Sequence, residues 1–141
     1  EMLGEAYLLF AHLVTHYAAA LLTPEAYGAR LAQMEKTTAL LAYIHENYQQ
    51  PITASALAKA NYISESHLCR SFKSAVGMPL TQYVNRLRVE KASVLLRGTD
   101  EDISAIARRV GIEDLGYFDR LFRRFAGVSP GAYRRAADKA K

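Results

Sequence analysis

The arginines between residues 116 and 135 are the side chains best suited to chemistry with another molecule. The segment reads GYFDRLFRRFAGVSPGAYRR, and its first half places Arg120, Arg123 and Arg124 among three phenylalanines. A guanidinium keeps its charge and offers five N–H donors in a planar arrangement, which suits carboxylates, phosphates and the acceptor edge of guanine. The phenylalanines follow one another at four and three residues, so they share one face of a helix. The segment therefore predicts a helix that packs by its aromatic side and offers cations to an anionic partner.

Basic charge is concentrated in the second part of the chain. Residues 1–50 carry two Lys/Arg against five Asp/Glu, for a net charge of −3. Residues 51–141 carry sixteen against nine, for a net charge of +7. This asymmetry indicates a polyanion as the partner of the second part.

The sequence offers little for catalysis, metal binding or membrane insertion. The single cysteine, Cys69, cannot form an internal disulfide, and no CxxC motif or Cys/His cluster suggests a zinc site. We find no nucleophile with a base, no cleft-like pair of carboxylates and no Gly-rich phosphate loop. The apolar start of the chain contains glutamates and histidines and lacks the basic beginning of a signal peptide. We therefore expect no catalytic residues, cofactor, metal or membrane span, and a cytoplasmic location.

The apolar residues recur at three and four positions, which predicts an all-α protein. Cap residues and glycines delimit the expected helices, which cover about residues 24–48, 53–61, 64–76, 80–97, 102–110, 114–126 and a short helix from 130. The expected N-caps are Thr23, Thr53, Ser64, Asp102 and Ser129, and Gly77, Gly98 and Gly127 are expected to end helices. Gly28 is a weak point in the first of these helices.

An internal repeat is the most informative feature of the sequence. At an offset of 50, Leu68, Arg70, Phe72, Lys73, Gly77 and Tyr83 match Phe118, Arg120, Phe122, Arg123, Gly127 and Tyr133. Upstream the offset is 49, which pairs Ala58 with Ala107 and leaves one extra residue in the turn of the second copy. Each copy combines a short helix, a tight turn with an apolar residue and a second helix, as in a helix-turn-helix. We expect these units at about residues 53–77 and 102–127.

The helix expected over residues 80–97 would link the two units. Its length of roughly 27 Å, at about 1.5 Å per residue, is comparable with the roughly 34 Å between successive major-groove faces on one side of a duplex. Such a linker could place both second helices on one side of DNA. The cluster of Arg86, Arg88 and Lys91 on this helix either lies near the nucleic-acid backbone or forms a solvated face.

Two stretches carry a resemblance to a known family. DISAIARRVGIEDLGYFDRLFRRFAGVSPGAYRR resembles the signature of the AraC/XylS family of bacterial transcription regulators. GMPLTQYVNRLRVEKASVLL looks like the linker helix of that family. The resemblance covers about residues 36–135 and implies two helix-turn-helix units, with a separate effector-binding or dimerisation domain on the N-terminal side.

The resemblance also implies which residues meet DNA. It places Ser66, Cys69 and Arg70 on the base-reading face of the first unit, and Leu115, Gly116, Asp119 and Arg120 at the matching places of the second. We expect Lys73, Arg123 and Arg124 to contact phosphates instead. For Arg70 and Arg120 the alternative to guanine contact is a phosphate contact or an ion pair within the helix. Ile112 and Gly116 depart from the usual Phe and Ser, so we expect weaker sequence discrimination by the second unit.

The N-terminal segment has a heptad spacing of apolar residues, which are Leu3, Tyr7, Phe10, Val14, Tyr17 and Leu21. This helical extension either docks on its own chain or forms a dimer seam, and the resemblance favours a homodimer through residues 3–21. Because the chain begins with glutamate, we expect a fragment of a longer protein. Residues 1–35 would end a missing regulatory or dimerisation domain, and residues 136–141 would form a tail.

The expected function is sequence-specific binding of double-stranded DNA by a transcription regulator. The habit of the family favours an activator and implies RNA polymerase as a further partner. One alternative is a helical protein-interaction module whose basic faces meet an acidic protein. Another is the DNA-targeting part of a larger enzyme.

Overall fold

The computed structural model describes residue 13 and residues 23–141, and the chain divides between Thr38 and Ala39 into two parts. Within residues 23–141 there are seven helices and no strand, which confirms the all-α fold. They are α2 Pro24–Asn47, α3 Ala54–Ala60, α4 Glu65–Val76, α5 Leu80–Gly98, α6 Ile103–Arg109, α7 Leu115–Ala126 and α8 Pro130–Lys139. None of the helices described is long and apolar enough to cross a membrane. The expected seam residues Leu3, Tyr7, Phe10, Val14, Tyr17 and Leu21 lie outside the described residues.

Three of the four helices that carry the repeat, α3, α4 and α7, begin with a side-chain cap. The Thr53 Oγ1 accepts a hydrogen bond from the Ala56 amide at 3.2 Å, and the Ser64 Oγ accepts from the His67 amide at 3.1 Å. In the second copy a carboxylate oxygen of Asp114 accepts from the amide of Tyr117. Each cap satisfies an N–H that the first turn of a helix leaves without a partner. The caps therefore set where the two second helices, α4 and α7, begin.

At four places the helices depart from the sequence signals. α2 runs through Gly28 without a break, because the roughly 1 kcal/mol cost of one glycine is too small to end a long helix. Gly98 is the last residue of α5, and the amide and hydroxyl of the following residue, Thr99, both donate to the Leu95 carbonyl. Asp102 precedes α6, but its side chain accepts no capping bond. α8 extends to Lys139, into the segment that we expected to be a tail.

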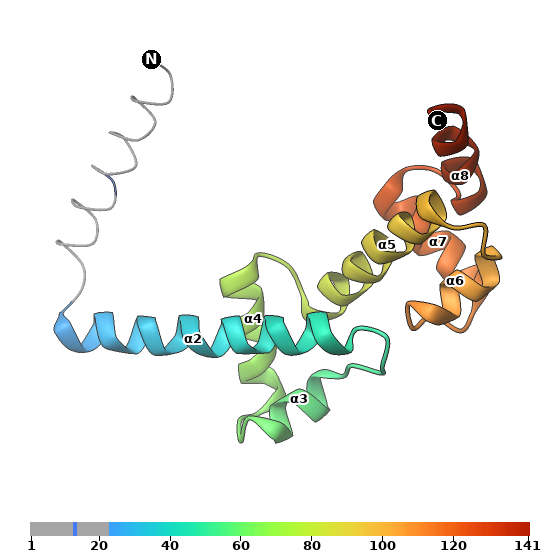
Figure 1. Cartoon of the computed structure of the whole chain (residues 1–141). Coiled ribbons are helices and arrows are strands. Elements are labelled where there is room, and N and C mark those ends of the chain that lie inside the picture. The colour runs from blue at the N-terminus through green and yellow to red at the C-terminus, as the bar shows by residue number, and fades with distance from the viewer. Residues whose placement is uncertain (1–12, 14–22) are drawn as a thin grey trace, which may run out of the picture. The chain divides into compact units, whose positions relative to one another are not determined.

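Two hydrophobic cores lie along α5. The first contains Ile44, Leu57, Ala58, Leu68, Phe72, Leu80, Val84 and Leu87. The second contains Val89, Ala92, Leu96, Ile106, Ala107, Val110, Ile112, Phe118, Leu121 and Phe122. Figure 1 shows the corresponding arrangement, with α4 near the start of α5 and with α6, α7 and α8 beside its second half. Each core thus belongs to one helix-turn-helix unit, and α5 is the linker helix that joins them.

The two units repeat the same aromatic contact. Phe72 packs edge-on against Tyr83 with ring centroids 5.6 Å apart, and Phe122 packs edge-on against Tyr133 at 5.4 Å. This is a favourable geometry for aromatic rings. Burial, together with the nearby charge of Glu90, raises the pKa of Tyr83. The matching pairs confirm that the offset of 50 residues reflects a structural repeat.

The turns repeat as well, with one difference. The Ile63 amide donates to the Ala58 carbonyl at 3.1 Å, and the Ile112 amide donates to the Ala107 carbonyl at 2.9 Å. Ile112 is buried, however, whereas Ile63 is exposed. The turn of the second unit is therefore packed against the rest of the protein, and the turn of the first unit is open.

Candidate nucleic-acid interface

α4 separates a buried face from an exposed polar face. Leu68 and Phe72 are buried in the first core. Val76 packs against the same core, whereas Ala75 is exposed. The exposed side carries the expected contact residues Ser66, Cys69, Arg70 and Lys73. These four residues lie within about a quarter to a third of the helix circumference at 100° per residue, so one ligand surface can meet them all.

The two cations on this face are available to a partner. Among residues 23–141, neither Arg70 nor Lys73 pairs with a carboxylate, and the ion pair with Glu65 considered for Arg70 does not form. Cys69 beside them is a free, exposed cysteine. The face of α4 therefore carries two positive charges and two small side chains that leave room for close approach.

The corresponding face of α7 has a different charge pattern. Phe118 and Phe122 are buried, while Arg120 and Arg123 are exposed. The Nε of Arg123 donates to the carboxylate of Asp119 at 2.7 Å, four residues earlier. An expected base contact and an expected phosphate contact are thus paired with each other. On this face, Arg120 therefore has no carboxylate partner among residues 23–141, whereas Arg123 has one.

Arg120 lies along α7 toward the start of the helix. Its guanidinium carbon is 5.9 Å from the centre of the Tyr117 ring. A side chain on Gly116 would come within 3.7 Å of the Arg120 guanidinium. This is an ordinary van der Waals distance, and the closer neighbour of such a Cβ would be the carboxylate of Asp114 at 3.3 Å. Leu115, the other expected contact residue, is 47% exposed at the first position of α7.

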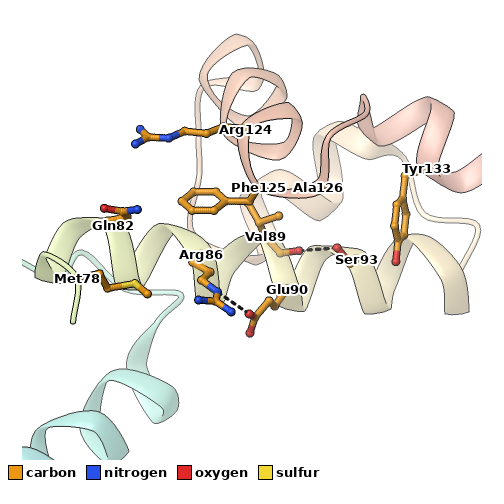
Figure 2. A pocket seen from close by; sticks show the side chains of 10 residues that line it. All are labelled: Met78, Gln82, Arg86, Val89, Glu90, Ser93, Arg124, Phe125, Ala126 and Tyr133. Atoms are coloured by element: carbon orange, nitrogen blue, oxygen red, sulfur yellow. Dashed lines mark hydrogen bonds and ion pairs between the residues drawn. The ribbon is translucent and has the colours of Figure 1, made fainter. Parts of the chain in front are cut away.

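Arg124 lies apart from this face, beside an open groove between α5 and the end of α7. The residues that line the groove are Met78, Gln82, Arg86, Val89, Glu90, Ser93, Arg124, Phe125, Ala126 and Tyr133. Figure 2 shows Arg124 extending from α7 along the groove, with Arg86 and Glu90 paired on α5. The guanidinium of Arg124 also lies over the ring of Phe125 at 5.7 Å. This position on the flank of α7 is better suited to a backbone phosphate than to a base edge.

The cationic cluster of the linker helix divides into two exposed residues, Arg86 and Lys91, which fit the expected solvated face, and the half-buried Arg88. Arg86 pairs with Glu90 at 3.1 Å, and the ammonium of Lys91 lies 5.8 Å from the centre of the Tyr48 ring. Arg88 is half-buried and donates to two backbone carbonyls, those of Tyr48 at 2.8 Å and Gln50 at 2.9 Å. Burial lowers the pKa of the Arg88 guanidinium. Arg88 is therefore a structural residue.

Two further contacts near α7 were missed in the sequence. Asn85 is buried on α5 and its Nδ2 donates to the Tyr117 hydroxyl at 3.1 Å. The backbone of Gly111 lies against the backbone of Gln49, whose carbonyl oxygen would be 2.7 Å from a Cβ at residue 111. The sequence signal for the second contact was the replacement of Tyr62 of the first turn by Gly111 in the second.

Among the described residues, no group of three or more His, Cys, Asp or Glu side chains could hold a metal ion. The exposed faces of α4 and α7 offer hydrogen-bond donors and fixed positive charge. Such groups bind phosphates and the acceptor edges of bases.

Comparison with known proteins identifies the class to which this arrangement belongs. A family model described as a helix-turn-helix domain matches residues 57–136, which is more than half of the chain. The chain belongs to the AraC family of helix-turn-helix transcription regulators. This is a family of regulators and not of enzymes.

Similar proteins match most of this chain and are longer than it. The HTH-type transcriptional regulator YisR of Bacillus subtilis is 30% identical over 132 residues, which cover 94% of this chain and 44% of YisR. The HTH-type transcriptional activator RhaS of an Enterobacter species is 35% identical over 99 residues, covering 70% of this chain and 36% of RhaS. The chain thus spans less than half the length of these relatives.

A solved structure has the same two-unit architecture. The DNA-binding domain of AdpA, in complex with a target DNA, superposes with a TM-score of 0.71 at 28% identity. The match covers 74% of this chain and 95% of that domain. The fold with two helix-turn-helix units on a linker helix is therefore the fold of this chain.

Proposed function

We propose that residues 36–135 bind double-stranded DNA in a sequence-specific manner, with α4 and α7 reading two adjacent major-groove segments. The observation that carries the proposal is the repeated exposed face, in which Arg70 of α4 and Arg120 of α7 hold equivalent positions without a carboxylate partner among residues 23–141. The structure of the AdpA domain with its target DNA supports this function.

The residues of each face would have different tasks. Arg70 and Arg120 would bridge the two acceptors of a guanine, and Ser66, Cys69, Leu115 and Asp119 would line the bases beside them. Lys73, Arg123 and Arg124 would neutralise phosphates. Because Asp119 binds Arg123 and Gly116 has no side chain, α7 offers fewer donors than α4. The second unit would accordingly discriminate less between sequences.

We further propose that the complete protein is a cytoplasmic transcription activator. The name of the relative RhaS supports activation, and RNA polymerase would then be a second partner. Residues 1–35 would end a regulatory or dimerisation domain, with a homodimer contact in residues 3–21.

Salt dependence distinguishes DNA binding from binding to an acidic protein. We expect the logarithm of the affinity for a duplex to fall linearly with the logarithm of salt, with a slope of about −0.9 for each phosphate neutralised. Fluorescence anisotropy with a labelled duplex, over a series of potassium chloride concentrations, measures this slope. If the chain binds no duplex at low salt, it is not a DNA-binding protein and the interaction-module alternative stands.

Substitution of the two readers tests how sequence is recognised. We expect Arg70→Ala and Arg120→Ala each to weaken binding to a duplex selected from a random pool by about 1–3 kcal/mol, with little effect on random DNA. Lys73→Ala is the matched control, because loss of a phosphate contact should weaken both duplexes alike. Equal losses on selected and random DNA for Arg70→Ala would show that Arg70 binds the backbone instead.

A further inference from the structure

We propose that a junction between the two helix-turn-helix units, formed by Arg88, the backbone of residues 48–50 and Gly111, sets the spacing of the two DNA segments that the protein reads. The part of the inference that concerns DNA rests on the proposed function. The junction itself is a property of the protein alone. Arg88 is thus a positioning residue and does not itself contact DNA.

Arg88 ties the linker helix to the segment that enters the first unit. Its Nε and Nη2 donate to the carbonyls of Tyr48 and Gln50, which are 40 and 38 residues away in the sequence. These two carbonyls flank residue 49, so the guanidinium holds the loop on both sides of Gln49. Charged donors form stronger hydrogen bonds than neutral ones, and the bond to the Tyr48 carbonyl is also partly buried. The loop therefore has a fixed place against α5.

The same loop touches the second unit. The ring of Tyr48 packs against both hydrophobic cores. A Cβ at Gly111 would be 2.7 Å from the Gln49 carbonyl oxygen, closer than side chains pack. Gly111 has a φ of 92°, and the buried Ile112 follows it. The turn of the second unit is therefore pressed directly against the entry loop of the first.

The two turns differ in how closely other parts of the backbone approach them, and among the described residues only the turn of the second unit has such a close neighbour. Tyr62 occupies the matching place in the first turn, where it also has a positive φ, of 55°. Tyr62 is 97% exposed, so nothing crowds its side chain. A left-handed residue at this place can therefore carry a side chain when the turn is open. At Gly111 the neighbouring backbone leaves no space for one.

A second contact constrains the reading helix itself. The buried Asn85 donates from α5 to the hydroxyl of Tyr117 on α7, and Arg120 lies over the ring of Tyr117. α5 joins the two units at one place, and the contact between the loop and the turn joins them at another. Two separate attachments fix the rotation of one unit relative to the other. A single connection would leave that rotation adjustable.

Fixed rotation matters because one added base pair both moves and turns a half-site. With about 10–10.5 base pairs per turn of roughly 34–36 Å, each added pair shifts the second segment by about 3.4 Å and rotates it by about 34–36°. A protein with a rigid junction cannot follow such a change without breaking contacts. It should therefore prefer one spacing.

The junction can be tested without DNA. Spin labels on the native Cys69 of α4 and on a Leu115→Cys variant of α7 would report the distance between the two reading helices in the whole chain. Labelled chains would be diluted with unlabelled chains so that only distances within one chain are measured. We expect a narrow distribution for the parent and a broader or shifted one for Arg88→Met. Arg97→Met removes the same charge from the exposed end of α5 and should leave the distribution unchanged.

Binding to spaced duplexes then tests the consequence for recognition. The probes are a duplex selected from a random pool by the parent chain, and copies with one base pair inserted or deleted between its two half-sites. We expect the parent to lose about tenfold or more in affinity on either change, comparable with one mismatched base pair. Arg88→Met should reduce that penalty severalfold while binding one isolated half-site as the parent does. Arg88→Lys, which retains one charged donor, should give an intermediate penalty.

The outcomes separate the junction from the proposed function. If Arg88→Met keeps both the narrow distribution and the spacing preference of the parent, the junction does not position the units. The same conclusion follows if Arg88→Met loses half-site binding as well, because Arg88 would then act on folding as a whole. A failure to select any duplex would overturn the proposed function, and the distance measurement would still decide whether the junction holds.

Discussion

Replacement of Phe122 by alanine should lower the free energy of unfolding by about 3–5 kcal/mol. The Phe122 side chain is fully buried, between Phe118 at 5.8 Å and Tyr133 at 5.4 Å between ring centroids. Its removal loses the transfer energy of a large aromatic ring and leaves a cavity that helices fixed by their caps cannot close. Since small domains have a total stability of about 5–15 kcal/mol, this loss is a large share. Urea unfolding followed by circular dichroism measures it.

Phe125→Ala on the same helix is the control for this prediction. Phe125 is only partly buried and lies at the edge of the second core. Removal of its ring should therefore cost clearly less than removal of the Phe122 ring. If the two variants unfold at the same urea concentration, the second core does not depend on Phe122 as its burial indicates.

Gly111→Ala should be the most damaging glycine substitution in the chain among residues 23–141. A residue other than glycine in a left-handed conformation costs roughly 1–2 kcal/mol. At Gly111 a Cβ would in addition be 2.7 Å from the Gln49 carbonyl oxygen, and that backbone cannot move without disturbing the loop held by Arg88. Overpacking of this kind typically costs a further 1–3 kcal/mol or so. Thermal and urea unfolding of the purified variant measure the sum.

Gly127→Ala separates the two costs. Gly127 has a similar positive φ, of 82°, but no atom lies within 4 Å of the place where its Cβ would be. It should therefore show the conformational cost without the steric cost, and unfold between the parent and Gly111→Ala. Equal losses for the two variants would mean that the loop yields freely at Gln49, against the close packing described for the junction.

Features encoded by nearby residues could be predicted from the sequence. The caps at Thr53, Ser64 and Ser129 follow from the chemistry of short hydroxyl side chains at the starts of helices. Gly77 and Gly127 end their helices in left-handed conformations, as the αL cap requires. The fold could be predicted because two such sets of cap residues and helix-ending glycines recur in one chain. The exposure of the expected contact residues on α4 and α7 followed from helical periodicity, whereas their roles toward DNA stay predictions.

Features that depend on distant backbone could not be predicted in the same way. Arg88 looked like its neighbours Arg86 and Lys91 in the sequence, and only the fold brings the Tyr48 and Gln50 carbonyls to it. The burial of Asn85 has the same origin, since its partner is 32 residues away. The pair of Asp119 and Arg123 is different. Its spacing of four residues on a helix was a readable signal of an ion pair.

The sharing of α5 between two cores has a thermodynamic consequence. Leu80, Val84 and Leu87 belong to the first core, and Val89, Ala92 and Leu96 belong to the second. Neither core can be lost without exposing one half of this helix, and short isolated helices are marginal in water. Loss of order in one unit must therefore weaken the other, although the two cores share no buried side chain. We therefore expect the two units to unfold together, in one cooperative transition.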